Sequence, residues 1–198
     1  AMRTSMPWPG SDSTPASVTT ARKRNYYFDG PIGAYQNTTT GQVMIFATMR
    51  RGGRAVYAFN VTDPVKPLLA WSINETTTDF TNLGQTWSTP RVALAKFDTA
   101  NPVLIMGGGF DNVAEDPASP ATTTTIGKGV YIIDMATGAL LKYLDTDHSV
   151  PSDVSYLDTD GDGFVDRGYV VDVRANVYRI DMEQADGTAL APASWVIT

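Results

Sequence analysis

The segment V-Y-A-F-N at residues 56–60 recurs as V-Y-I-I-D at 130–134 and as V-Y-R-I-D at 177–181. Valine, isoleucine and tyrosine favour β-strands, so each copy predicts one strand of a repeated unit. The repeated tyrosines are 74 and 47 residues apart, and the second spacing is near the ~40–50 residues of a four-stranded propeller blade. The pattern therefore predicts consecutive blades of a β-propeller.

The longer first spacing requires an insertion in the second unit. Segment 111–127 is rich in threonine, proline and alanine, and it contains four consecutive threonines from Thr122. Such a composition is typical of a long loop. We therefore expect 111–127 to connect two strands of the second blade.

Apolar runs on both sides of each repeat predict further strands. The runs before the repeats are 43–49, 103–109 and 169–173, and those after them are 68–73, 140–144 and 194–197. Innermost strands are assigned to 30–35, 88–95 and 150–157, each with a proline or glycine that suits a crowded position. The prediction is an all-β fold of about three four-stranded antiparallel units, without a long amphipathic helix.

The expected units do not make a complete propeller. Propellers close with ~4–8 blades, so three units leave unpaired edges. We expect the chain to be about half of a larger propeller, or to receive partner blades from elsewhere. Residues 1–25 are rich in proline, serine and threonine without periodicity, which predicts an irregular arm before a partial propeller over 26–198.

The composition disfavours several classes of function. The 198 residues include 15 Lys and Arg against 21 Asp and Glu, so nucleic acid is an unfavourable partner. With 0 cysteines and 1 histidine, the chain lacks the residues for a thiolate zinc site, a cysteine nucleophile or a multi-histidine metal centre. Its apolar runs are far shorter than the ~20 residues of a membrane-spanning helix, so no membrane span is expected.

The segment D-T-D-G-D-G-F-V-D at 158–166 concentrates four aspartates and two glycines. Ca²⁺ takes ~6–8 oxygen ligands, and carboxylates at loop positions 1, 3 and 5 can surround one ion because glycine at position 6 permits a sharp turn. Without a cation the carboxylates would repel one another, so the loop predicts a calcium site. The candidate ligands are the carboxylates of Asp158, Asp160 and Asp162, the backbone carbonyl of Phe164, and Asp166 directly or through water.

This loop differs from a helix-flanked calcium loop in two respects. Position 12 is Tyr169, where a bidentate glutamate is expected, and the flanking segments are predicted strands. Mg²⁺ is disfavoured because it demands compact octahedral geometry and retains its waters. The alternative is a solvated Asp-Gly turn without a metal, although such a turn requires only one or two of these residues.

A histidine, a run of three glycines and three tryptophans are expected to have structural rather than catalytic or ligand-binding roles. His148 lies among aspartates without a nucleophile context, and it is expected to be a surface loop histidine. Gly107–Gly109 follows a predicted strand but precedes no helix, so close packing at the propeller channel is favoured over phosphate binding. Trp71, Trp87 and Trp195 are expected to fill space between blades, with a carbohydrate platform as the alternative.

Residues 25–198 resemble the PilC/PilY family of type IV pilus tip adhesins. The likeness rests on Y-F-D-G at 27–30, G-G-R-A-V-Y-A-F-N-V-T-D-P at 52–64, and the aspartate loop followed by Y-R-I-D at 178–181. The resemblance implies a C-terminal propeller related to quinoprotein propellers, with one Ca²⁺ in the aspartate loop. Ala175 stands in place of a usual glycine and Tyr178 in place of a usual tryptophan, and both are expected to be packing changes.

The resemblance also implies a function. Calcium bound by Asp158, Asp160, Asp162, the Phe164 carbonyl and Asp166 would govern pilus extension and retraction, and so twitching motility and adhesion. The protein would lie at the pilus tip or outer membrane of a Gram-negative bacterium, with minor pilins and host or surface ligands as partners. We expect no catalysis. The alternatives are part of a pyrroloquinoline quinone dehydrogenase propeller and a passive calcium-stabilised scaffold.

Overall fold

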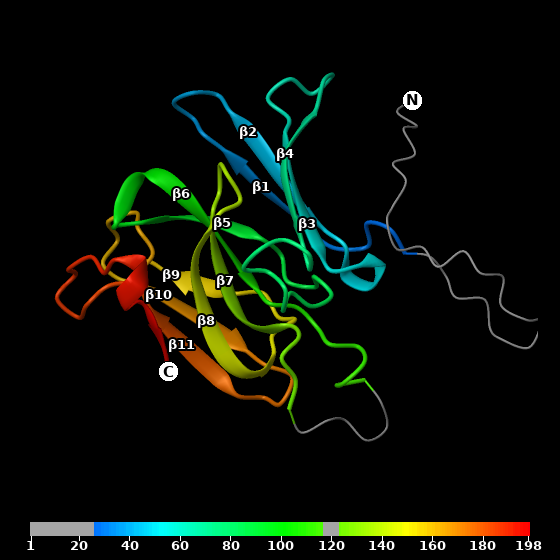
Figure 1. The fold of residues 1–198 in the computed structure, drawn as a ribbon. Coiled ribbons are helices and arrows are strands. Elements are labelled where there is room, and N and C mark those ends of the chain that lie inside the picture. The colour runs from blue at the N-terminus through cyan, green and yellow to red at the C-terminus, as the bar shows by residue number, and fades with distance from the viewer. Residues whose placement is uncertain (1–25, 117–122) are drawn as a thin grey trace, which may run out of the picture.

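The computed structural model of the chain describes residues 26–116 and 123–198 (Figure 1). Within these ranges, the regular elements are twelve strands and two short 3₁₀ helices. The strands form three four-stranded sheets, and each sheet is an antiparallel up-and-down meander. The predicted all-β fold of three units is therefore confirmed. No helix in the described ranges is long and apolar enough to cross a membrane.

Each sheet keeps its four strands in chain order. The first contains β1 (Ile32–Gln36), β2 (Val43–Thr48), β3 (Ala55–Asn60) and β4 (Leu68–Asn74), with η1 (Arg50–Gly52) between β2 and β3. The second contains β5 (Arg91–Ala95), β6 (Asp98–Gly107), β7 (Lys128–Asp134) and β8 (Leu140–Ser149). The third contains β9 (Ser155–Leu157), β10 (Arg167–Val171), β11 (Val177–Asp181) and β12 (Val196–Ile197), with η2 (Pro192–Ser194) before β12. The repeated segment forms the third strand of every sheet.

Several strand boundaries differ from the prediction, including the two on either side of Val150. β8 extends to Ser149, and β9 begins only at Ser155, where a strand from Val150 was expected. The N–H of Val150 donates instead to the carbonyl of Gly127, and its own carbonyl accepts from the N–H of Gly109. These hydrogen bonds join Val150 to the connection between β6 and β7, and a local pattern does not reveal such distant partners.

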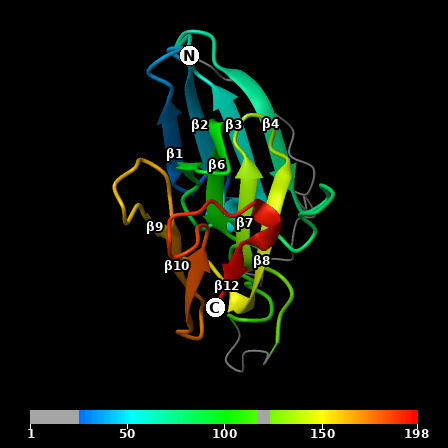
Figure 2. The same ribbon diagram turned by 90° about the vertical axis from the view of Figure 1, so that its left-hand side faces the viewer.

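The second sheet lies between the other two and is buried on both faces (Figures 1 and 2). Leu104 and Met106 of β6 pack against the first sheet, whereas Val103 and Ile105 pack against the third. Side chains alternate between the faces of a strand, so a strand that is buried on both faces reads as a continuous apolar run. This explains the uninterrupted V-L-I-M at 103–106.

The first and third sheets each bury one face against the second. In the third sheet, Val170 and Ile180 are buried, whereas Val171 and Val177 are 42% and 70% exposed. The described sheets do not close into a ring (Figure 1). The arrangement is therefore a partial propeller.

Glycines and tryptophans bring the sheets close together. A side chain at any position of Gly107–Gly109 would collide with a backbone carbonyl, so the predicted close packing is confirmed. The Nε1–H of Trp71 in β4 donates to the carbonyl of Met135, beyond the end of β7, at 3.0 Å. Trp195 is buried in the cluster between the second and third sheets, where its ring meets Phe97 edge to face. These two tryptophans fill space between blades as expected.

Trp87 is only half-buried, and the guanidinium of Arg50 lies over its ring. The connection between β6 and β7 is the predicted long loop of the second sheet, and its described parts, 108–116 and 123–127, belong to no named strand. The rest of that loop lies outside the described residues, as does the predicted arm over 1–25.

Candidate metal centre

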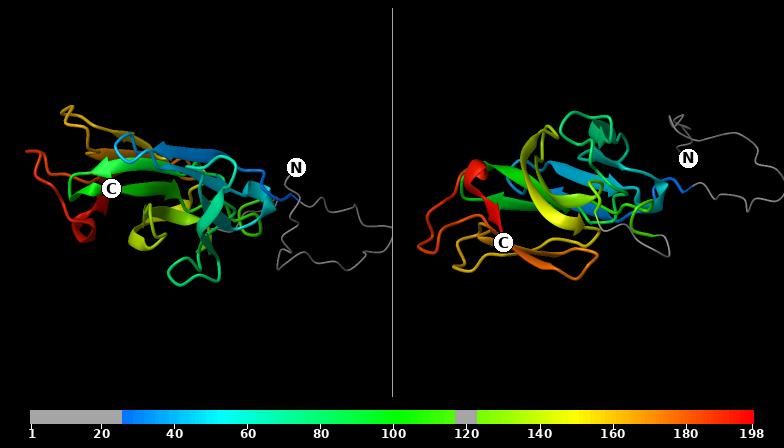
Figure 3. Two further views of the ribbon diagram at one scale, coloured as in Figure 1. Left: turned by 90° about the horizontal axis from the view of Figure 1, so that it is seen from above. Right: turned by 60° about the horizontal axis from the view of Figure 1, so that its bottom comes forward.

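The aspartate loop, residues 158–166, joins β9 to β10 at one end of the third sheet, and it projects from that sheet in Figures 2 and 3. Its flanking segments are strands, as predicted. β9 and β10 pair over only three residue pairs, so the sheet supports little of the loop. Gly161 and Gly163 have φ of 79° and 92°, a conformation that other residues rarely adopt, and they let the loop turn back on itself.

The four predicted carboxylates come together in this loop. One oxygen from each of Asp158, Asp160, Asp162 and Asp166 lies within 4.8 Å of the others. Two ligands that are 2.3–2.6 Å from one Ca²⁺ can be at most about 5 Å apart, so the spacing fits a single ion. Phe164 belongs to the same loop, and its carbonyl stays a prediction as a ligand.

Backbone hydrogen bonds within the aspartate loop determine which carboxylate oxygens remain available. Asp158 accepts backbone N–H bonds on both of its oxygens. Asp160 accepts on Oδ1 from the N–H of Asp162 at 3.2 Å, and Asp162 accepts on Oδ1 from the N–H of Phe164 at 2.9 Å. The Oδ2 atoms of Asp160 and Asp162 are therefore left for a cation.

Asp166 is the buried member of the cluster, with 3% of its surface exposed. Its Oδ2 accepts from the N–H of Thr159 at 2.5 Å and from the Thr159 hydroxyl. Burial opposes its ionisation, but the hydrogen bonds from Thr159 outweigh this effect and keep the pKa of Asp166 below its ordinary value. Its Oδ1 is buried without a hydrogen-bond partner in the described chain. Such an atom is costly unless it is satisfied, and a bound cation would satisfy it.

Lys96, in the turn between β5 and β6, brings a positive charge from the second sheet to the loop. Its Nζ is 2.6 Å from Oδ2 of Asp162 and 3.8 Å from Oδ2 of Asp160. It also lies 3.1 Å from Oε2 of Glu183 and 3.1 Å from the carbonyl of Gly187. The hydrogen bond from Lys96 is the largest cause of the lowered pKa of Asp162. Sequence reasoning missed Lys96 and Glu183, since no motif links them to the loop.

A cavity of about 360 Å³ borders the aspartate loop. Phe164 and Val165 line it from the loop, Tyr35 from β1 and Val92 from β5. Tyr156 of β9 also lines it, and its hydroxyl donates to the carbonyl of Val92 at 2.9 Å. The loop therefore meets residues of all three sheets at one place.

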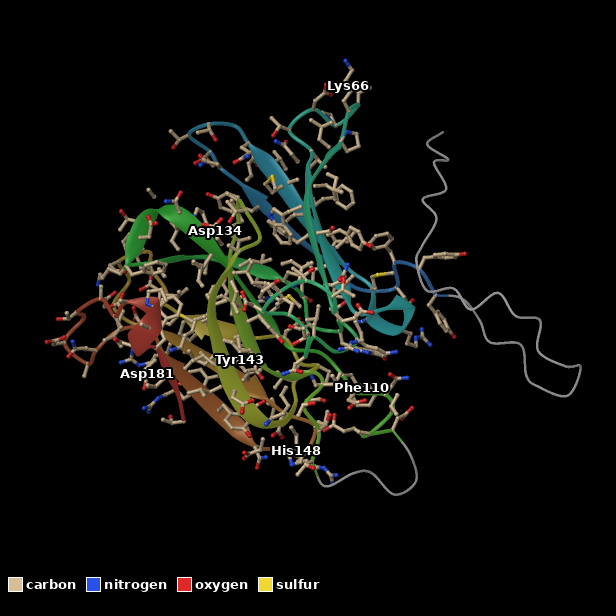
Figure 4. All side chains as sticks on the ribbon, in the orientation of Figure 1. Lys66, Phe110, Asp134, Tyr143, His148 and Asp181 are labelled. Carbon is tan, nitrogen blue, oxygen red and sulfur yellow. The ribbon has the colours of Figure 1, made fainter. Side chains whose placement is uncertain are left out.

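The prediction for His148 is wrong. His148 lies near the end of β8 rather than in a surface loop, and its side chain is 17% exposed (Figure 4). Its Nδ1 lies 3.6 Å from Oε1 of Glu115, whose side chain is buried. Glu115 comes from the long connection between β6 and β7, so its approach to His148 follows from the tertiary fold.

The two departures from the family pattern are more than packing changes. Ala175 has φ of 66°, in the left-handed region that favours glycine. The hydroxyl of Tyr178 donates to Oδ2 of Asp172 at 2.9 Å and accepts from the N–H of Asp147 at 3.0 Å. The first departure therefore affects backbone conformation, and the second makes a hydrogen bond between the second and third sheets.

Three meander sheets packed face to face, one of which carries an acidic loop between two strands, define a segment of a β-propeller with a candidate metal site. The chain belongs to the PilY1 β-propeller domain family, whose model matches residues 20–194. The crystal structure of the Pseudomonas aeruginosa PilY1 C-terminal domain has a similar fold, with a TM-score of 0.67 and 24% identity. That match covers 87% of this chain and 36% of the crystallised chain.

Two curated relatives support the same family. The type IV pilus biogenesis factor PilY1 homolog of Xylella fastidiosa is 27% identical over 196 residues, and PilY1 of Pseudomonas aeruginosa strain PAO1 is 26% identical over 144 residues. The matches cover 88% and 70% of this chain. The chain spans only 12% and 11% of the lengths of these relatives. The resemblance inferred from the sequence is confirmed.

Proposed function

We propose that this chain is a calcium-binding propeller segment of a type IV pilus biogenesis factor at the cell surface. Its role would be in pilus extension and retraction, twitching motility and surface adhesion. The observation that carries the proposal is the gathering of four carboxylates within 4.8 Å in a PilY1-type propeller. The buried Oδ1 of Asp166, which lacks a partner in the described chain, supports a bound cation. The names of the relatives support the pilus role.

The proposed ligands are Asp158, Asp160, Asp162, the carbonyl of Phe164 and Asp166. When bound, Ca²⁺ supplies positive charge and a common centre for these oxygens. Two backbone hydrogen bonds already fix the end of the loop. The N–H of Val165 donates to the carbonyl of Leu94 at 2.8 Å, and the N–H of Asp166 donates to the carbonyl of Leu157 at 2.9 Å. The exposed tip has no such support, so the ion would mainly order the tip.

The proposed action is a change in a binding surface rather than catalysis. The loop lines the cavity that all three sheets share, so ordering of the loop would change the shape of that cavity. The partners would be other pilus components, such as minor pilins, and host or surface ligands. Tight binding of pyrroloquinoline quinone would instead favour the dehydrogenase alternative.

Calorimetric titration with Ca²⁺ tests the proposal. The variants Asp158→Ala and Asp162→Ala each lose a ligand, so their calcium affinity should fall at least tenfold, about 1.4 kcal/mol. Asp63→Ala, which removes a carboxylate from an exposed turn of the first sheet, should bind as the parent does. Mg²⁺ should compete poorly. Parent-like affinity in both loop variants would overturn the ligand assignment.

The same Asp162→Ala change, placed in the full-length pilus factor, tests the biological role. The amount of surface pili and the twitching motility of the variant strain should match those of the parent strain grown in calcium-depleted medium. Normal motility of a strain whose loop no longer binds calcium would mean that pilus function does not require calcium binding by this loop.

A further inference from the structure

The ammonium of Lys96 lies against two of the four carboxylates that a metal ion would need. It contacts Oδ2 of Asp162 at 2.6 Å and approaches Oδ2 of Asp160 at 3.8 Å. These are the two oxygens that the loop backbone leaves without N–H donors. Lys96 therefore neutralises the same atoms that would bind the cation.

Lys96 also has partners outside the proposed ligand set. Oε2 of Glu183 and the carbonyl of Gly187 each lie 3.1 Å from its Nζ. Both residues belong to a short turn, closed by the bridge between Glu183 and Ala189 and by the hydrogen bond from the N–H of Gly187 to the carbonyl of Gln184. The carboxylate of Glu183 is buried, and its Oε1 has no partner in the described chain. The neighbouring ammonium of Lys96 lowers the cost of burying this carboxylate in its charged form.

The two cations cannot share Asp162 without a cost. A divalent ion and an ammonium that contact one carboxylate repel each other, and this repulsion is large at separations of a few ångströms. The backbone of Lys96 is anchored near the loop, since its neighbour Phe97 packs against Trp195. Its least costly response is to leave Asp162 and to keep Glu183 and Gly187.

We propose that Lys96 is a tethered counter-cation that competes with Ca²⁺ for the aspartate loop, and that ion binding transfers its ammonium entirely to Glu183 and Gly187. The inference rests on the proposed calcium function of the same loop. In the calcium-free state Lys96 holds the loop tip to the second sheet. In the calcium-bound state it strengthens the turn at 183–189. Lys96 therefore sets the calcium concentration at which the loop responds and links the loop to two neighbouring segments.

Lys96→Met tests the competition, because methionine retains an apolar stem and removes the charge. Its calcium affinity should rise about tenfold, equivalent to ~1.4 kcal/mol, and added salt should reduce the difference. Lys96→Arg should stay near the parent, which separates charge from packing. Lys128→Met is the matched control, because Lys128 pairs with Asp145 at 3.3 Å and takes no part in the loop. A Lys96→Met protein that folds and binds calcium no more tightly than the parent overturns the proposal.

A double-mutant cycle with Glu183→Gln tests the transfer. The single change removes the partner that Lys96 would retain, so calcium affinity should fall. In the Lys96→Met background the same change should have little effect, because the ammonium is gone. An equal loss in both backgrounds would mean that Glu183 acts directly on the ion, and it would overturn the transfer.

The outcomes separate the two proposals. If the parent does not bind Ca²⁺, or binds it independently of Asp162, the proposed function fails. If the parent binds Ca²⁺ through Asp162 but Lys96→Met gains no affinity, only the role of Lys96 fails.

Discussion

Ala175 has the backbone conformation of a glycine in the turn between β10 and β11. With φ of 66°, its Cβ crowds the following carbonyl, which costs roughly 1–2 kcal/mol. The turn forms nonetheless, because the buried carboxylate of Asp172 accepts hydrogen bonds from the backbone N–H groups of Arg174 and Asn176. Asp172 also accepts from the hydroxyl of Tyr178, which anchors the turn to β11.

Ala175→Gly should stabilise the protein by about 0.5–1 kcal/mol. Relief of the Cβ strain outweighs the greater flexibility that glycine gives to the unfolded chain. The matched control is Ala136→Gly, at an exposed turn position without positive φ, and it should lower stability slightly. Urea unfolding measures both changes. A fall in the midpoint for Ala175→Gly would contradict the strain assigned to this residue.

The aspartate loop is an element with unequal support along its length. The backbone N–H groups of Val165 and Asp166 fix the end of the loop, because they donate to the carbonyls of Leu94 and Leu157. Its tip is exposed and depends on hydrogen bonds to its own carboxylates and on Lys96. Few buried contacts and exposed backbone hydrogen bonds are the features of a segment that opens locally. Residues 158–164 take no part in the two hydrophobic clusters between the sheets, so we expect the blades to keep their fold when the tip opens.

Hydrogen exchange with and without calcium should show protection gained near residues 155–172 and little change elsewhere. Binding to the folded state stabilises by RT ln(1 + [L]/Kd), about 2.7 kcal/mol at a hundredfold excess over Kd. This stabilisation should appear as a higher free energy of local opening of the aspartate loop, because the bound ion would hold the loop closed. Asp162→Ala should abolish the gain under the same conditions. A uniform change across all three sheets would instead identify the ion as a general stabiliser.

The whole molecule depends on its central sheet, which supplies one face to each of two hydrophobic clusters. Leu104 of β6 is fully buried, whereas Val171 of β10 lies on the free face of the third sheet and is 42% exposed. Similar truncations at these positions therefore have different consequences. The difference reflects mainly the burial of each side chain in the sheet stack.

Leu104→Ala should lower the free energy of unfolding by about 2–5 kcal/mol, because it leaves a cavity between two sheets. Val171→Ala should cost less than about 1 kcal/mol, since its side chain already contacts solvent. Denaturant midpoints with unchanged slopes would report these values. Equal losses at the two positions would contradict the sandwiched arrangement of the second sheet.

Strand positions and the aspartate cluster were predictable from the sequence because both are local. Alternating and continuous apolar runs mark strands by their period, and the threefold segment at 56–60, 130–134 and 177–181 marks the blades. The four aspartates lie within nine residues, so a single turn is enough to bring them together. Errors occurred where a distant partner set the boundary, as at Val150, which bonds to Gly109 and Gly127.

Only the tertiary structure brings Lys96 and Glu183 to the loop, places Glu115 beside His148, and joins Tyr178 to the backbone of Asp147. These partners are separated along the chain and share no motif, so no local pattern records them. They meet because three sheets, each buried against the next, fix the turns at their ends relative to one another. The local order of residues in 158–166 was enough to bring the four aspartates of the proposed calcium site together, whereas the packing of the sheets sets which charges surround them.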